Sequence, residues 1–167
     1  RLVRGEDDVL NELDENAIEA AVQMKEAEED AGREAEVIAL TMGPEDAEDA
    51  LMRALQMGAD RAFLVSDEFL EGSDVITTAS VLSVAIAKIS EECGPVDLVV
   101  TGMASLDAMT SMLPGALAAK AHMPLLGLAR TLSVADGAVT IERSVDGYTE
   151  TLDRKSTRLN SSHSGES

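Results

Sequence analysis

The stretch TGMASLDAMTSMLPG, residues 101–115, holds the residues best suited to bind a ligand. Pro114 lacks an N–H group and fits only the first turn of a helix, so the pattern predicts a helix that starts at Thr110 or Ser111. Residues 102–109 then form a loop that is longer than packing requires and that ends on hydroxyl caps. The free N–H groups and positive dipole end of such a helix start are suited to phosphate.

The sequence that follows Asp107 is free of acidic residues over a long segment. From Ala108 to Ala135 there are 28 residues without Asp or Glu, where the chain average of 32 acids in 167 residues would give roughly five. By contrast, three acids follow Gly43-Pro44 in the first turn of another expected helix, and they would repel a phosphate. The acid-free segment fits a phosphate site, although burial in the sheet or at a subunit contact would explain it equally well.

Patterns that would indicate catalysis or metal binding are missing from the sequence. There is no GxGxxG or Walker loop, and His122 and His163 lack metal-ligand spacing. His122, close to Pro124, fits a helix-end residue. Cys93, the single cysteine, has no motif around it and cannot form a disulfide within the chain. Without a nucleophile-base pair, we expect no catalytic residues and no metal site.

The composition of the chain restricts its partners and its core. The 32 acidic and 13 basic residues give a formal net charge of −19, which makes nucleic acid and anionic membranes poor partners. The apolar runs are far shorter than the roughly 20 residues that span a bilayer, so we expect no membrane insertion. Aromatic residues are limited to Phe63, Phe69 and Tyr148, so aliphatic side chains must build the core.

Hydrophobic patterns predict the elements that position the loop. Apolar residues at helical spacing, ended by glycines, predict helices over residues 14–31, 44–57 and 74–93. Short unbroken apolar runs predict buried strands at residues 37–41, 61–66 and 96–101. Their alternation predicts a parallel α/β sheet with right-handed crossovers, which binds ligands beyond the carboxyl ends of its strands. Those ends are residues 41–43, 66–67 and 101–102.

The two ends of the chain differ from its body. Residues 125–151, around Asp136-Gly137, predict a hairpin or edge strands. The last segment, RKSTRLNSSHSGES, is rich in Ser and basic residues, so we expect a domain over residues 1–153 and a disordered tail foreign to the gene over 154–167. The chain starts at Arg1 without Met, so any targeting signal would lie upstream, outside the sequence.

Several stretches resemble, in order and spacing, the beta subunit of electron transfer flavoproteins, the family that includes FixA. They are LNELDENAIEAAVQMKE, VIALTMGPEDAEDALMRALQMGADRAFLV, VDLVVTGMASLDAMTSMLPGALAAKAHMPLLGLA and VTIERSVDGYTETL. The resemblance covers about Val9 to Leu152, and GPEDAxxxLxxALxMGADRA and TGxxSxDAxTS are specific to that family. It implies a Rossmann-like fold of the adenine nucleotide alpha hydrolase type, a parallel sheet with helices on both faces, followed by C-terminal hairpin strands.

The resemblance also implies a function. The beta subunit binds AMP structurally, or a second FAD in its place, and forms a heterodimer with an alpha subunit that holds most of the FAD. Through that FAD, electrons pass from dehydrogenases, such as acyl-CoA dehydrogenases, to a quinone oxidoreductase and the respiratory chain, in bacteria in the cytoplasm. The subunit catalyses no reaction itself. Leu13 matches the position that approaches the flavin. The nucleotide-binding positions that match are Asn11, Glu12, Leu13, Asp14, Met42, Gly102, Met103, Ala104, Ser105, Asp107, Thr110, Ser111, Met112 and Leu113.

The sequence also departs from the family pattern, and two other classes stay open. The family's first strand would precede Arg1, its long arm would follow Leu152, and Ser111 stands where Gly is common. A stand-alone nucleotide sensor of the universal stress protein type would carry GxxGxxxxxxxxxG[ST], but Ser105 stands where its second Gly would lie. A structural interaction subunit without any ligand is the third class.

Overall fold

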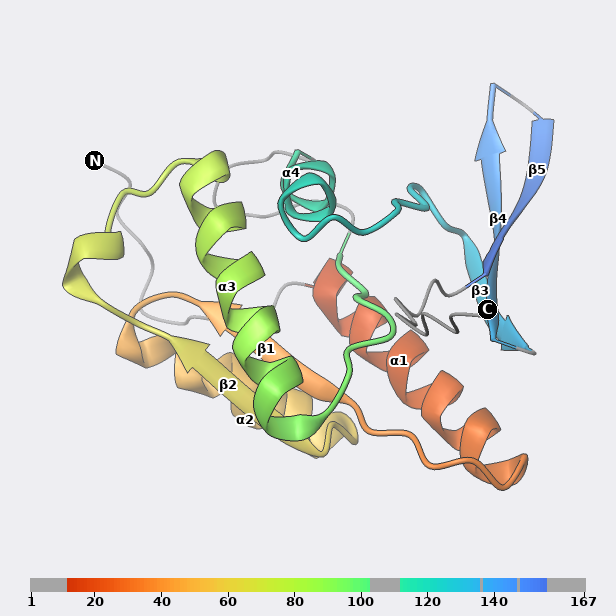
Figure 1. Ribbon diagram of the computed structural model, residues 1–167, viewed down its shortest axis with the longest axis horizontal. Helices are drawn as coiled ribbons and strands as arrows, with labels where there is room; N and C mark the ends of the chain where they lie inside the picture. The colour runs from red at the N-terminus through yellow and green to blue at the C-terminus, as the bar shows by residue number, and fades with distance from the viewer. Residues whose placement is uncertain (1–11, 103–111, 136, 147, 156–167) are drawn as a thin grey trace, which may run out of the picture.

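The computed structural model describes residues 12–102, 112–135, 137–146 and 148–155 (Figure 1). Short strands alternate with helices in the first part of the chain, and strands alone follow the last helix. In order, the elements are α1 (Glu12–Asp30), β1 (Ile38–Met42), the 3-10 turn η1 (Glu45–Ala47), α2 (Glu48–Met57), β2 (Arg61–Val65), the 3-10 turn η2 (Glu68–Leu70), α3 (Val75–Cys93), α4 (Leu113–Lys120), β3 (Thr131–Ala135), β4 (Ala138–Val145) and β5 (Tyr148–Lys155). Within these ranges, no helix is long and apolar enough to span a membrane.

The first half of the chain folds around a parallel pair of strands. β1 and β2 lie in a register that pairs Ile38 with Arg61 and Met42 with Val65, and α2 makes the crossover between them. α2 packs against both strands, while α3 passes over the other face of the pair in Figure 1. This arrangement confirms the predicted α/β fold with a parallel sheet and helices on both faces.

The prediction of a strand at residues 96–101 is wrong. These residues have no regular secondary structure, and the parallel sheet of the described segments holds β1 and β2 alone. An apolar run indicates an extended segment, but a strand forms only where its N–H and C=O groups pair in register with a neighbouring strand. Leu98 is 37% exposed, so this segment lacks the cover that a central strand would have.

The contacts of one carboxylate show in which direction α1 runs relative to the strands. Asp60, directly before β2, accepts a hydrogen bond from the backbone N–H of Val37 at 2.8 Å and pairs with the ammonium group of Lys25. The backbone N–H of Asp60 also donates to the Val37 carbonyl at 2.8 Å. Lys25 lies in the second half of α1 and Val37 directly precedes β1, so this half lies at the amino ends of the strands. The start of α1 therefore points toward their carboxyl ends (Figure 1).

The helix α2 supplies much of the core beside the strands. Its acidic first turn, with Glu48 and Asp49, is favoured by the helix dipole. Leu51 and Ala54 are buried on its inner face. The helix ends at Gly58, whose φ of 117° is left-handed, as the sequence predicted for this position.

Gly58→Ala is expected to lower the free energy of unfolding by roughly 1 kcal/mol, because an L residue at this φ is strained. The new Cβ would also lie 3.2 Å from Cγ1 of Val22 on α1. Gly72→Ala is the matched control, since Gly72 has a φ of 74° with nothing within 4 Å of the added Cβ. Urea unfolding of both variants separates the backbone strain, which both share, from the contact with Val22, which only Gly58→Ala makes. An equal loss in both would show that α1 and α2 do not approach closely at Gly58.

The helices α3 and α4 pack against each other. Asp74 caps α3 by accepting a hydrogen bond from the backbone N–H of Thr77 at 2.7 Å. Ala79 and Ile89 are buried on α3, and Leu117 is buried on α4. Through this contact α3 holds α4 in place, and α4 begins at the end of the loop predicted to bind a ligand.

The C-terminal strands form an antiparallel sheet in the order β3-β4-β5. β3 and β4 pair from Thr131–Glu142 to Ala135–Ala138, and the buried Ile141 lies on the central strand. The predicted hairpin strands are thus confirmed, with a second hairpin added between β4 and β5. β5 extends to Lys155, so Arg154 and Lys155 of the expected tail pair with β4. The rest of that tail lies outside the described residues, and its disorder stays a prediction.

Candidate functional site

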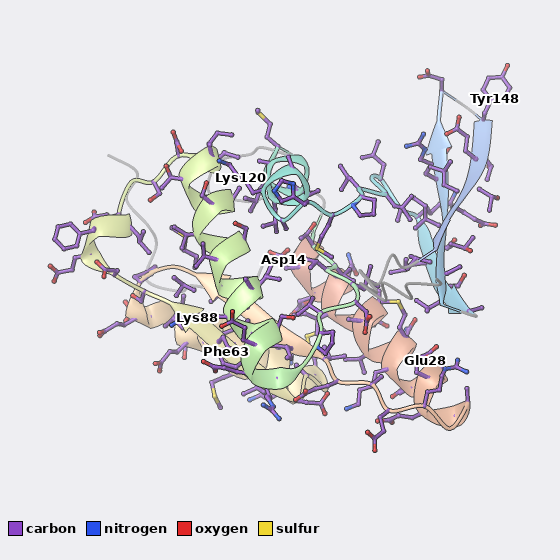
Figure 2. All side chains as sticks on the ribbon, viewed as in Figure 1. Asp14, Glu28, Phe63, Lys88, Lys120 and Tyr148 are labelled. Atoms are coloured by element: carbon purple, nitrogen blue, oxygen red, sulfur yellow. The ribbon has the colours of Figure 1, made fainter. Side chains whose placement is uncertain are left out.

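Two of the segments predicted to bind nucleotide meet at the start of α1. The carboxylate oxygen Oδ1 of Asp14 accepts a hydrogen bond from the backbone N–H of Gly102 at 3.1 Å, across 88 residues of sequence. Asp14 is the third residue of α1 (Figure 2), and Gly102 directly precedes the stretch 103–111. Both residues are half-buried. The contact brings the beginning of the predicted loop to the first turn of α1.

Asp14 lies in the first turn of α1, a position that suits an acidic side chain. The first turn of a helix has a positive dipole end, which stabilises a carboxylate there. A hydrogen bond from a backbone N–H to a charged oxygen is stronger than one between neutral groups. The Asp14 to Gly102 contact is thus a firm attachment between α1 and the chain that follows α3.

Met42 lies at the same end of the sheet. It is the last residue of β1, it pairs with Val65 of β2, and it is half-buried. The backbone N–H of Gly43 donates to the Val65 carbonyl at 3.1 Å, which holds the chain against β2 as it leaves the sheet. Because α1 begins toward the carboxyl ends of the strands, Met42 and Asp14 belong to one side of the molecule (Figure 1).

The helix α4 begins later than the sequence predicted. It starts at Leu113, and its N-cap is Met112, whose side chain makes no capping hydrogen bond. The prediction of a start at Thr110 or Ser111 is wrong, because Pro114 needs only to lie in the first turn. Starts at residue 111 and at residue 113 both meet that requirement, and the hydroxyl side chains favoured the earlier one.

The first turn of α4 keeps the electrostatic character that the sequence indicated. It carries no acidic residue, whereas the first turn of α2 carries Glu48 and Asp49. Helix geometry leaves the first N–H groups without intrahelical acceptors, and Pro114 has no N–H. The N–H of Ala116 already donates to the Met112 carbonyl at 3.0 Å. Leu113 and Gly115 are the residues of this turn whose N–H groups are suited to meet an anion.

The remaining predicted positions are only partly described. Glu12 and Leu13 open α1 beside Asp14. The others lie outside the described residues, and their place in a site stays a prediction: Asn11, Met103, Ala104, Ser105, Asp107, Thr110 and Ser111.

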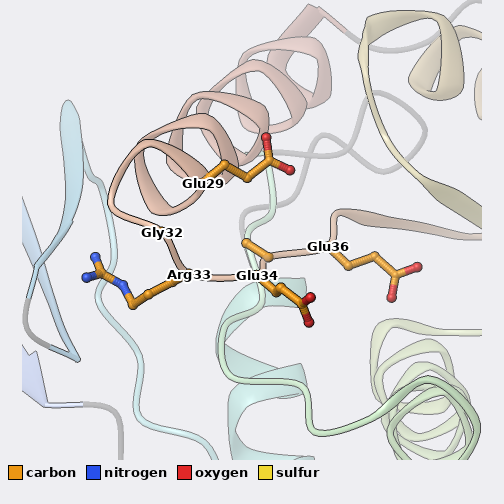
Figure 3. A pocket seen from close by; sticks show the side chains of 6 residues that line it. Glu29, Gly32, Arg33, Glu34 and Glu36 are labelled. Carbon is orange, nitrogen blue, oxygen red and sulfur yellow. The ribbon is translucent and has the colours of Figure 1, made fainter.

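A separate open hollow of about 510 Å³ lies beyond the C-terminal end of α1 (Figure 3). Its lining residues are Glu29, Gly32, Arg33, Glu34, Ala35 and Glu36. Arg33 is engaged with Glu28, with Nη2 2.9 Å from Oε1, and this bond lowers the pKa of the Glu28 carboxyl. The lining carboxylates would repel a phosphate, so this hollow does not suit a nucleotide. Over the described ranges, no group of three or more His, Cys, Asp or Glu residues is placed to hold a metal.

Asp60 is a residue that periodicity alone did not single out. It lies in the stretch GADRA that carries the family resemblance, but helix and strand patterns treat it as a link between α2 and β2. The hydrogen bond from Lys25, together with that from the Val37 N–H, lowers the pKa of the Asp60 carboxyl. A charged residue two positions after a helix-ending glycine and directly before a strand was the available signal for a link to another element.

The parallel β1-α2-β2 unit places the chain among Rossmann-like α/β proteins. The family model described as electron transfer flavoprotein domain matches residues 1–158, and the chain belongs to this family.

Curated relatives carry matching names. The chain is 39% identical over 147 residues to the electron transfer flavoprotein subunit beta of Mycobacterium leprae, covering 88% of this chain and 54% of that protein. It is 34% identical to the subunit beta of Megasphaera elsdenii, covering 86% and 53%. Identity to the protein FixA of Azorhizobium caulinodans is 36%, covering 86% and 50%. The chain therefore spans about half the length of the curated relatives it matches.

Proposed function

We propose that this chain is part of the beta subunit of an electron transfer flavoprotein. The subunit binds AMP as a structural ligand, or a second FAD in its place, and it supports electron transfer through an FAD shared with an alpha subunit. Dehydrogenases such as acyl-CoA dehydrogenases supply the electrons, and a quinone oxidoreductase passes them to the respiratory chain. The proposed location, the bacterial cytoplasm, follows from the family resemblance. The observation that supports the proposal most is the Asp14 to Gly102 contact within a chain of this family.

The described residues fit the phosphate-bearing end of an adenine nucleotide. The start of α4 offers backbone N–H groups without an acidic side chain in the same turn. The Asp14 to Gly102 contact holds the beginning of the preceding stretch, and Met42 borders the same end of the sheet. Both AMP and FAD carry an adenosine phosphate, so this fit applies to either ligand.

The described residues offer little to a flavin ring. Phe63 is half-buried within β2, while Phe69 and Tyr148 are 97% and 76% exposed on η2 and β5. None of these aromatic residues belongs to α1 or to the segments that flank Gly102. FAD supplies the redox chemistry when it is bound, and we propose that the alpha subunit provides most of its contacts. This chain then acts as a carrier subunit without catalytic residues.

The stand-alone sensor of the universal stress protein type is the weaker alternative. Its loop would require Gly at the position of Ser105, and the family match runs from residue 1 to residue 158. The ligand identifies the class, because a sensor of that type would hold ATP, whereas a purely structural subunit would hold nothing.

Thr110→Val tests the proposed loop in the full-length protein bound to its alpha subunit. Removing one neutral hydrogen bond is worth about 0.5 to 1.5 kcal/mol, so AMP retention should fall several-fold. Asp107→Ala should also weaken it. Thr149→Val, at an exposed position on β5, is the matched control and should leave retention unchanged. The readout is the AMP affinity by isothermal titration, and unchanged affinity in both loop variants would contradict the assignment.

A further inference from the structure

We infer that Asp14 is a positioning residue that holds Gly102, and with it the start of the nucleotide-binding stretch, in place before any ligand arrives. The family resemblance implies only that Asp14 touches the nucleotide. This inference rests on the proposed function and assigns the Asp14 carboxylate a different task. Its direct partner is the backbone N–H of Gly102, at 3.1 Å.

The surroundings of Asp14 make this attachment well defined. α1 is anchored at its other end by the Lys25 to Asp60 pair and, near its start, by Glu15, whose Oε1 lies 3.2 Å from Nε of Arg53 on α2. Asp14 is therefore carried by a helix that is fixed to the α/β unit at two places. A carboxylate on such a helix places Gly102 relative to β1 and β2.

The two described ends of the nucleotide-binding stretch are then held by different elements. Gly102 is attached to α1, while Met112 and Leu113 lead into α4, which packs against α3. Fixing both ends of a segment reduces the number of conformations that a ligand must order on binding. The contact therefore contributes to affinity without touching the ligand.

Charge argues against a direct contact between Asp14 and the phosphate. AMP brings a phosphate that is close to doubly ionised at neutral pH, and a half-buried carboxylate beside it would add like-charge repulsion. The start of α4 has no acidic residue in its first turn and is the better place for the phosphate. The Asp14 carboxylate instead stabilises the position of the Gly102 backbone, through the hydrogen bond that it accepts.

Asp14→Ala in the full-length protein with its alpha subunit should weaken AMP binding about tenfold, because a hydrogen bond to a charged group is lost. Asp14→Asn keeps an acceptor for the Gly102 N–H and should restore most of the affinity. Glu19→Ala is the matched control, because Glu19 is an exposed carboxylate of α1 whose hydrogen-bond partner, Gln23, lies on the same helix. It should leave AMP affinity unchanged.

Hydrogen exchange of the Gly102 amide separates positioning from direct contact. In the nucleotide-free wild-type complex this amide should be protected, and Asp14→Ala should remove the protection while added AMP leaves the wild-type rate nearly unchanged. Protection that appears only after AMP is added would overturn the inference, as would unchanged AMP affinity in Asp14→Ala. If the wild-type complex binds no AMP, the proposed function fails, yet Gly102 protection still tests the attachment. If Asp14→Ala does not fold, two other results test the inference. They are protection of the Gly102 amide in the nucleotide-free wild-type complex and the AMP affinity of Asp14→Asn.

Discussion

Asp60→Ala is expected to lower the free energy of unfolding by about 2 kcal/mol and to loosen α1. A hydrogen bond from a backbone N–H to a charged oxygen is worth about 1.5 to 3 kcal/mol, and the lower half of that range applies to a side chain open to solvent. The Asp60 side chain is 34% exposed and accepts from Val37 at 2.8 Å. Lys25 loses its pairing partner as well.

The same substitution is expected to change how stability depends on pH. The hydrogen bond from Lys25, followed by that from Val37, holds the pKa of Asp60 below its usual value. A depressed pKa in the folded state means that the carboxylate stabilises the fold fully above its unfolded pKa of about 3.9. That contribution is lost as the pH falls through the folded pKa. The difference between wild type and variant should therefore be steady near neutral pH and shrink below about pH 4.

Two further variants isolate the contributions to this effect. Asp60→Asn keeps an acceptor for Val37 and loses the charge pair with Lys25, so its stability should lie between those of wild type and Asp60→Ala. Glu26→Gln removes a negative charge from an exposed position of α1 and is the matched control for the change in net charge. Urea unfolding across a pH series is the measurement. If Asp60→Ala behaves like Glu26→Gln, Asp60 does not hold α1.

The second large effect concerns flavin. The 167-residue chain expressed by itself should purify colourless, because its aromatic residues, Phe63, Phe69 and Tyr148, lie on β2, η2 and β5, and none lies on α1. The sequence from Gly102 to Leu113 also contains no aromatic residue, so no ring is available there to stack on a flavin. The chain spans about half the length of its relatives, and the remainder and the alpha subunit would supply the missing contacts.

Absorbance near the flavin bands of the purified chain is the direct readout for this prediction. The full-length protein co-expressed with its alpha subunit is the positive control and should give a yellow complex. A chain that purifies yellow by itself and accepts electrons from an acyl-CoA dehydrogenase would contradict the proposed role as a carrier subunit.

The sequence predicted the elements whose signals are local. The apolar runs at β1 and β2 and the glycine after α2 were each sufficient to place the boundary of an element to within a few residues. Whether residues 96–101 pair with a neighbouring strand does not depend on their local sequence, and the prediction of a strand there was wrong. The start of α4 also depended on more than its composition, since Pro114 tolerates several starting points in its first turn.

In the candidate site, too, the local sequence predicted which residues matter but not which of them come into contact. The family resemblance named both Asp14 and Gly102, and the loop pattern also pointed to Gly102, yet only the three-dimensional structure shows that one accepts a hydrogen bond from the other. Periodicity describes which face of an element is buried but contains no information on which residues 88 positions apart come into contact. The role of Asp60 was missed for the same reason, because its partners are 35 and 23 residues away in the sequence, Lys25 on α1 and Val37 directly before β1.

We propose that this chain belongs to a subunit that holds an adenine nucleotide at the start of α4, next to the Gly102 backbone that Asp14 positions. Mass spectrometry of the small molecules released by denaturing the purified full-length complex tests it most directly. We expect AMP in an amount equal to the beta subunit, or FAD in twice that amount if a second FAD takes its place. Release of ATP would instead identify a sensor, and a beta subunit that releases no adenine nucleotide beyond the shared FAD would contradict the account.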